Sequence, residues 1–214
     1  MSPSQFKENF DKLFSKELEK FIKRASSISK SKKIHEVINH LKPLSENGKR
    51  LRPYVLYLGY GQEKIDKKIV SQMVAVELLH LFALIHDDIM DASPKRHGVK
   101  TIHNLSKNEN LGKSFAMLAG DLVFNFAYES FIKGNENPLS KEIFATLIEE
   151  VVIGQLLDAE LSCSKTFSKE DLDQKTLLKT ARYTFRRPLE IGLALRNEKV
   201  DKNTVKIYSQ IGEN

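Results

Sequence analysis

The stretch MVAVELLHLFALIHDDIMD, residues 73–91, decides the fold class, because it is apolar nearly all round at helical spacing. We predict a helix that lies deep in a protein core. Its exceptions share one helix face: Glu77, His80, Asp87 and Asp91. Buried carboxylates without partners are costly, so this polar stripe must face water, cations or a metal.

The three aspartates of this stretch, Asp87, Asp88 and Asp91, admit two interpretations. They can form an exposed helix end, although carboxylates at a helix C-terminus oppose the helix dipole and need compensation. Alternatively, carboxylates four residues apart direct their oxygens at one hard cation, and oxygen ligands favour Mg²⁺, which is often shared with substrate phosphates. We favour the second interpretation, a magnesium site for a diphosphate.

Two basic clusters flank this helix. Lys95 and Arg96 follow it, and the earlier segment GKRLRP, residues 48–53, places three cations in a short loop that enters a helix. Such loops suit phosphate groups. Together with the carboxylates, the two clusters indicate two anion sites, one bridged by metal and one held by side chains.

Helical spacing of apolar residues continues nearly throughout the chain, and no stretch alternates as a strand does. We therefore expect a single all-α domain over residues 1–214. Ser168 and Asp171 form a capping box at the start of one helix. The expected helices lie near 4–28, 33–42, 52–60, 64–92, 110–132, 139–163, 169–186, 188–197 and 202–214. In the last of them, Val205, Tyr208 and Ile211 trace an apolar face up to Asn214, so we expect the architecture to continue beyond that residue.

Composition indicates the cellular compartment of the protein and the class of partner that it binds. The single cysteine, Cys163, rules out an internal disulfide framework, and no signal-peptide core or apolar run of about 18 residues is apparent. We expect a cytoplasmic protein without a membrane span. The net charge of +6 is compatible with nucleic acid, a membrane surface or an anionic small molecule. The lysines are scattered among acidic residues, as on a solvated helix face, so we expect no nucleic-acid partner.

Six motifs occur in a recognisable order. They are GKRLRP (48–53), ELLHLFALIHDDIMD (77–91), KRHG (95–98) leading to Thr101 and His103, AGD (119–121), GQLLDAE (154–160) and KTARYTFRRPLEIG (179–192). From about Gly48 onward the chain resembles the trans-prenyltransferases, or polyprenyl diphosphate synthases, of the geranylgeranyl and farnesyl diphosphate synthase type. The resemblance implies the isoprenoid synthase helical bundle around a central cavity.

The resemblance also implies residue roles. Asp87 and Asp91 would bind Mg²⁺ on the allylic diphosphate with help from Asp88, and Lys179 would join these three in catalysis. The residues implied for isopentenyl diphosphate are Lys49, Arg52, His80 and His97. Those implied for the allylic diphosphate are Arg96, Lys179, Thr180, Gln155 and Asp158. The implied reaction ionises the allylic diphosphate to a carbocation, which the isopentenyl double bond attacks, and the implied assembly is a homodimer.

The chain departs from the family pattern in two respects. His97 stands where a second arginine is usual, so a titratable group replaces a permanent cation. The family's second aspartate-rich motif is missing, since no Asp-Asp pair follows Asp88, and we expect a C-terminally incomplete bundle. This leaves open an alternative function, a non-catalytic prenyltransferase-like subunit or truncated fragment that binds isoprenoid diphosphates without turnover.

Product length in the family depends on bulk just before the first aspartate motif. Phe82 lies five residues before Asp87 and the small Ala83 lies four before it. This pattern resembles geranylgeranyl diphosphate synthases and predicts a C20 product. The competing interpretation is that Phe82 belongs to the ordinary core.

Overall fold

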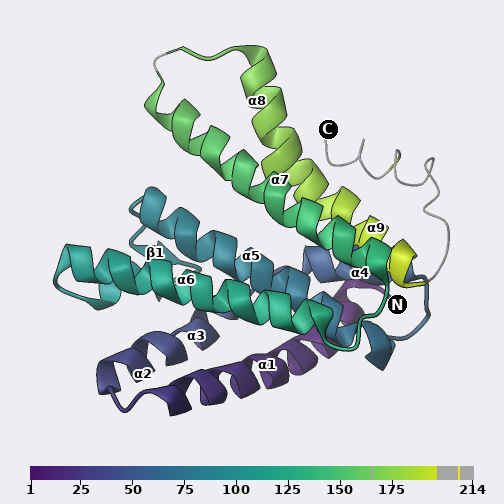
Figure 1. Ribbon diagram of the computed structural model, residues 1–214, viewed down its shortest axis with the longest axis horizontal. Coiled ribbons are helices and arrows are strands. Elements are labelled where there is room, and N and C mark those ends of the chain that lie inside the picture. Colours follow the sequence, from purple (N-terminus) through teal and green to yellow (C-terminus); the bar gives the residue numbers. More distant parts are fainter. Residues whose placement is uncertain (165, 197–206, 208–214) are drawn as a thin grey trace. The chain divides into compact units, whose positions relative to one another are not determined.

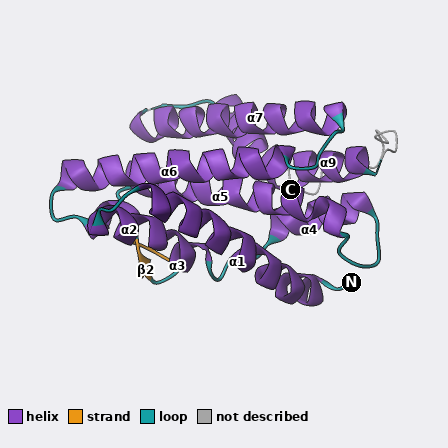
Figure 2. Ribbon diagram, turned by 60° about the horizontal axis from the view of Figure 1, so that its bottom comes forward, coloured by secondary structure: helices purple, strands orange, loops and turns teal. Residues whose placement is uncertain are grey.

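A computed structural model describes residues 1–164, 166–196 and 207, and these are helical almost throughout (Figure 1 and Figure 2). Apart from Ile207, the helix expected over 202–214, with Val205, Tyr208 and Ile211, lies outside the described residues. The all-α fold class is confirmed by the structure and by its similarity to solved structures, given below. The expected extent of one domain over 1–214 stays a prediction.

The α-helices are α1 (Pro3–Ile28), α2 (Lys32–Asn39), α3 (Leu41–Ser45), α4 (Leu51–Tyr60), α5 (Val70–Met90), α6 (Glu109–Ile132), α7 (Pro138–Cys163), α8 (Lys169–Thr176) and α9 (Arg187–Leu195). Two 3₁₀ segments are η1 (Lys67–Ile69) and η2 (Ile102–Leu105), and η3 (Leu177–Arg186) is a π-helix. Most bounds agree with the expected ones within a few residues, and Ser168 with Asp171 forms the expected capping box of α8. Three expectations were wrong: α5 begins six residues later than expected, the helix expected over 33–42 is divided into α2 and α3, and the one expected over 169–186 is divided into α8 and η3.

The expectation that no stretch forms a β-strand was wrong. The chain contains a β-hairpin of two short strands, β1 (Lys95–Arg96) and β2 (Val99–Lys100). Arg96 pairs with Val99 in antiparallel register. The two-residue turn consists of His97 and Gly98, whose φ angles are +51° and +83°. Such a turn requires positive φ at both positions, and Asn-Gly or Asp-Gly is its usual sequence. Histidine also tolerates this region better than most residues, so the sequence lacked the usual signal.

The chain divides into two units, which are described separately. Unit 1 comprises Met1–Arg50 and Val74–Lys133. Its core includes a ladder of aromatic rings on α1, in which the centroids of Phe6 and Phe10 lie 5.5 Å apart. The ring of Phe21 on α1 stacks on that of Phe126 on α6 at 4.7 Å. These contacts bury the apolar face of α1 within the unit.

Helix α5 is buried in its first half as expected. Seven of its residues are no more than 1% exposed: Gln72, Met73, Val74, Ala75, Val76, Leu78 and Leu79. Burial decreases toward the end of the helix, where Asp87 is half-buried and Met90 is 50% exposed. The helix therefore presents its C-terminal carboxylates at the end of an apolar rod.

Unit 2 comprises Leu51–Met73 and Gly134–Asn214. Helices α4 and α9 approach very closely within it. A Cβ atom on Gly59 would lie 2.4 Å from the carbonyl oxygen of Leu189, and one on Gly192 would lie 2.2 Å from that of Leu56. Both contacts are too short for any side chain, so each helix requires glycine where it meets the other.

Among the residues that the structure describes, Lys67–Met90 and Glu109–Ile132 are long and apolar enough to cross a membrane, contrary to the expectation that no run reaches that length. This evidence is weak, since the core helix of a soluble protein passes the same test. In the most apolar window of the first stretch 61% of the residues are buried, and in that of the second 44%. The buried share of the first stretch is typical of a core helix.

Candidate functional site

The aspartates at the end of α5 have different surroundings. Asp87 is half-buried and Asp91 is exposed, one helical turn later. The amide N–H of Asp91 donates to the carbonyl of Asp87 at 2.9 Å, so the helical geometry continues to Asp91 and both carboxylates occupy one face. Within the described residues, no group of three or more histidine, cysteine or acidic side chains is arranged to hold a metal. The candidate donor set is thus a pair of carboxylates.

This pair fits Mg²⁺ by the chemistry of its donors. Magnesium binds oxygen ligands and keeps several waters, so one or two protein carboxylates together with substrate phosphates commonly suffice. A cation at this position also compensates the negative end of the α5 dipole. Asp87 and Asp91 are therefore the residues of this chain that suit the ion.

Asp88 lies apart from this pair, because its side chain points into the protein. It is 3% exposed, and its Oδ1 accepts hydrogen bonds from Nε and Nη2 of Arg96 at 2.8 and 2.6 Å. Burial raises the pKa of Asp88, and the hydrogen bonds and charge of Arg96 offset only part of this rise. The ion pair connects α5 to strand β1. The ion pair of Asp88 with Arg96 thus connects the aspartate motif to a residue expected to bind the allylic diphosphate.

The end of α5 is fixed by a Schellman motif. The amide of Ser93 donates to the carbonyl of Asp88 at 3.0 Å, and that of Ala92 donates to the carbonyl of Ile89 at 3.3 Å. Ala92 has φ +48°, where glycine is usual. Thr101, which is fully buried, then donates its hydroxyl to the carbonyl of Ser93 at 2.8 Å and closes the base of the hairpin. His97 is held at the exposed hairpin turn by these contacts.

The polar stripe of α5 begins with a structural ion pair. Glu77 is 4% exposed and accepts a hydrogen bond from Nη1 of Arg50 at 2.7 Å. The expectation that the stripe faces cations holds here, and the cation comes from the segment 48–53. His80, the next member of the stripe, is half-buried.

The basic residues of segment 48–53 are not equivalent. Lys49 is exposed, whereas Arg50 is buried. Arg52 is half-buried in unit 2, and its guanidinium carbon lies 4.2 Å from the ring centre of Tyr183 on η3. This stacking holds the planar group by its face and is a favourable cation–π contact.

Unit 2 contains a second group of expected site residues. Asp158 on α7 accepts hydrogen bonds from Nζ of Lys179 on η3 at 2.5 Å, and it lies 3.0 Å from Nζ of Lys175. Burial acts to raise the pKa of Asp158, but the two lysines outweigh it and hold the pKa below its usual value. Gln155 is half-buried one turn earlier, and Thr180 is exposed. A π-helix such as η3 is often found at a functional site.

Sequence reasoning missed a buried ion network in the same unit. Glu150 on α7 accepts a hydrogen bond from Arg182 at 2.8 Å and two from Arg187 at 2.7 and 2.8 Å. Arg187 also donates to Glu190 at 2.7 Å. The signal was present, because Glu150 falls at helical spacing on the apolar face of Ile143 and Leu147, like Glu77 on α5.

The proposed chain-length residue packs against aromatic neighbours in unit 1. The ring centroid of Phe82 lies 5.2 Å from that of Phe124 on α6 and 4.6 Å from that of His86. Ala83 is half-buried beside it. Phe82 is therefore part of an aromatic cluster, which agrees with either interpretation of its role.

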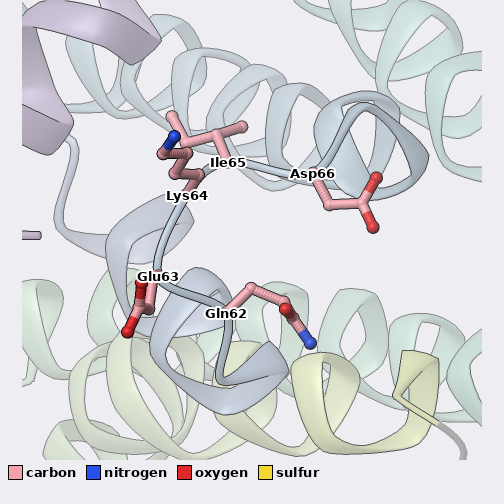
Figure 3. Close-up of a pocket in the computed structure, with 5 residues that line it drawn as sticks. All are labelled: Gln62, Glu63, Lys64, Ile65 and Asp66. Atoms are coloured by element: carbon pink, nitrogen blue, oxygen red, sulfur yellow. The ribbon is translucent and has the colours of Figure 1, made fainter.

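A surface hollow of about 420 Å³ lies elsewhere, in the segment between α4 and η1. Five consecutive residues line it, from Gln62 to Asp66. Figure 3 shows that their side chains project in different directions, so no polar groups converge on a ligand. None of the expected site residues lines this hollow.

Comparison with known proteins adds to this geometry. A short chain isoprenyl diphosphate synthase of Methanocaldococcus jannaschii is 33% identical over 168 residues, which are 77% of this chain and 49% of that protein. A geranylgeranyl diphosphate synthase of Saccharolobus solfataricus is 34% identical over 164 residues, 72% of this chain and 46% of that protein. The chain thus spans about half the length of these curated relatives.

Solved structures agree in fold. The geranylgeranyl pyrophosphate synthase of Corynebacterium glutamicum, complexed with isoprenyl diphosphate and magnesium, superposes with a TM-score of 0.81 at 24% identity, covering 95% of this chain and 64% of that one. The family model described as polyprenyl synthetase matches residues 31–214. With most of its length matched by that model, the chain belongs to the polyprenyl synthetase family.

Proposed function

We propose that the protein is a short-chain prenyltransferase, which joins isopentenyl diphosphate to an allylic diphosphate. The observation that carries the proposal is the pair Asp87 and Asp91, one turn apart at the open end of a buried helix, while Asp88 is paired with Arg96. Relatives named as isoprenyl and geranylgeranyl diphosphate synthases support it. Because those relatives are synthases, the non-catalytic alternative is not favoured.

Mg²⁺ is the proposed metal, held by Asp87 and Asp91. Solved relatives contain isoprenyl diphosphate with magnesium in one case and with calcium in another, a polyprenyl synthase of Caulobacter crescentus. When bound, the ion would neutralise diphosphate charge and so make the diphosphate a better leaving group.

The cations of the chain would bind and orient the two diphosphates. Lys49, Arg52 and His80 would hold isopentenyl diphosphate, and the stacking of Arg52 on Tyr183 limits the motion of its guanidinium before the ligand arrives. His97, at the exposed hairpin turn, would add a cation only when it is protonated.

The allylic diphosphate would be bound by Arg96, Lys179 and Thr180, with Gln155 and Asp158 beside it. Lys179 is already paired with Asp158, which keeps its ammonium in place without a ligand. A diphosphate that binds there would compete with Asp158 for the ammonium groups of Lys175 and Lys179. Apolar and aromatic side chains such as Phe82 would exclude water from the growing prenyl chain and set its length at C20.

We further propose a cytoplasmic homodimer without nucleic-acid partners. The burial of α5 supports the soluble state, because more than half of its most apolar window is covered by protein.

The proposal is tested with the purified protein, geranyl diphosphate, radiolabelled isopentenyl diphosphate and Mg²⁺. We expect extraction of labelled prenyl product, and calorimetric binding of geranyl diphosphate that requires Mg²⁺. Asp87→Ala and Asp91→Ala should each lower turnover by orders of magnitude and abolish Mg²⁺-dependent binding, with the melting temperature nearly unchanged. Asp173→Ala, on the exposed face of α8, is the control. Parent-like activity of both site variants, or absence of product together with Mg²⁺-independent binding in the parent, would overturn the proposal.

A further inference from the structure

Arg50 has the most complete set of partners of the three cations in segment 48–53. Its side chain is 6% exposed. Nε donates to Asp11 at 2.6 Å, Nη1 to Glu77 at 2.7 Å and Nη2 to the carbonyl of Ser45 at 2.8 Å. Its guanidinium carbon lies 4.7 Å from the ring centre of Phe14. One side chain therefore connects α1, the end of α3 and α5.

The charges of this cluster are balanced. Asp11 also accepts a hydrogen bond from Lys7 at 2.5 Å, so two carboxylates face two cations. Burial acts to lower the pKa of Arg50, but Glu77 and Asp11 outweigh it and the pKa is raised. The guanidinium is thus a permanent charge in a closed set of partners, and a diphosphate would have to break several of these bonds to reach it.

The backbone around Arg50 is shaped to make these contacts. Arg50 has φ +54°, a left-handed conformation that is strained for a side chain of its size. Gly48 lies over the ion pair, since a Cβ there would come within 2.6 Å of Nη1 of Arg50 and 3.1 Å of Oε1 of Glu77. The residues on both sides of Lys49 are therefore fixed by the same cluster, while Lys49 itself is exposed.

We propose that Arg50 is a positioning residue for Lys49: its bonds to Asp11, Glu77 and Ser45 hold the loop in the one conformation that presents the ammonium of Lys49 to isopentenyl diphosphate. The proposal rests on the proposed function for the role of Lys49. A preorganised cation does not have to lose loop freedom when the ligand binds, and this lowers the cost of binding. Arg50 acts through Lys49 and touches no substrate.

The first test compares Arg50→Lys with Lys49→Met in the purified protein. Lysine keeps the positive charge but lacks the planar fork that reaches three acceptors at once. We expect each variant to raise KM for isopentenyl diphosphate about tenfold, the value of one charge-assisted hydrogen bond, with a smaller change in kcat. KM for the allylic substrate should stay within twofold.

The second test is the double variant of Lys49→Met with Arg50→Lys. If Arg50 acts through Lys49, the double variant should have the same KM as Lys49→Met alone. Additive effects on KM would show that Arg50 acts elsewhere and would overturn the proposal. Glu77→Gln and Asp11→Asn, which keep Arg50 but weaken its anchors, should resemble Arg50→Lys and serve if that variant does not fold.

Arg24→Lys is the matched control, because Arg24 makes a bidentate ion pair with Glu129 and stacks over Phe21 in the same unit. It should lower the melting temperature without changing KM. If Arg50→Lys likewise lowers only the melting temperature, the role of Arg50 is purely structural and the inference is wrong. If Lys49→Met leaves KM unchanged while labelled product still forms, the positioning inference fails and the proposed reaction stands.

Discussion

Ala92 closes helix α5 in a conformation that suits glycine. Its φ of +48° places the Cβ close to its own carbonyl oxygen, a cost of about 1–2 kcal/mol for an L-residue. The conformation is nevertheless kept, because the Schellman hydrogen bonds of Ala92 and Ser93 satisfy carbonyls at the end of the helix. The chain therefore carries local strain one residue beyond Asp91.

We expect Ala92→Gly to relieve this strain. The free energy of unfolding should rise by about 1 kcal/mol, somewhat less than the strain itself because glycine also gives the unfolded chain more freedom. Urea denaturation measures it. The control is Ala145→Gly, in the exposed interior of α7, where the same exchange should instead cost about 1 kcal/mol. A loss of stability in both variants would contradict the strain at Ala92.

At the scale of elements, α7 and η3 are held together by an ion network rather than by apolar contacts alone. Glu150 joins the π-helix to the first residue of α9, through Arg182 and Arg187 respectively. The pKa of Glu150 would rise on burial, but the hydrogen bonds and charges of these two arginines hold it below the usual value. The carboxylate is thus bound as an anion, and its contribution to stability depends on pH.

We expect Glu150→Gln to lower the free energy of unfolding by about 3 kcal/mol at pH 7, because it removes the buried carboxylate that pairs with two half-buried arginines. The folded pKa is depressed, so the stabilisation is complete above the pKa of the unfolded chain and is lost as pH falls through the folded pKa. The difference between parent and variant should therefore shrink below about pH 4. Urea titrations at several pH values test this. Glu149→Gln, its exposed neighbour, should show no such dependence.

The elements show what could be predicted from the sequence. Helix bounds followed from apolar spacing and from local caps such as Ser168, because both signals lie within a few residues. The sequence did not predict the hairpin, because His97 and Gly98 are an uncommon pair for its turn. It did not predict that η3 is a π-helix, because a π-helix has no distinct apolar signature. The partners of Glu77 and Asp88 come from distant segments, so a single sequence showed that partners were needed but not which ones.

At the scale of the whole molecule, the described structure comprises two units that each contain part of the expected site. Asp87, Asp91 and Arg96 belong to unit 1, whereas Asp158, Lys179 and Arg52 belong to unit 2. The chain spans about half the length of its curated relatives. Phe82, the residue proposed to set product length, belongs to unit 1.

We expect Phe82→Ala to lengthen the product beyond C20, because removing the ring opens space next to Phe124 and His86. Product lengths are measured by chromatography of the dephosphorylated prenyl alcohols. Phe167→Ala, which removes an aromatic ring that is 56% exposed, should leave them unchanged. An unaltered distribution in both variants would make Phe82 an ordinary core residue.

The reciprocal contact of Gly59 with α9 and Gly192 with α4 restricts how this protein can be altered. Each α-carbon faces a carbonyl oxygen of the other helix at a distance that excludes even a methyl group. A larger residue at one of these positions cannot be compensated by a smaller residue at the other, because both positions are already glycine. In a random-mutagenesis library selected for function, these two codons should therefore remain glycine, while the surrounding helix faces diversify.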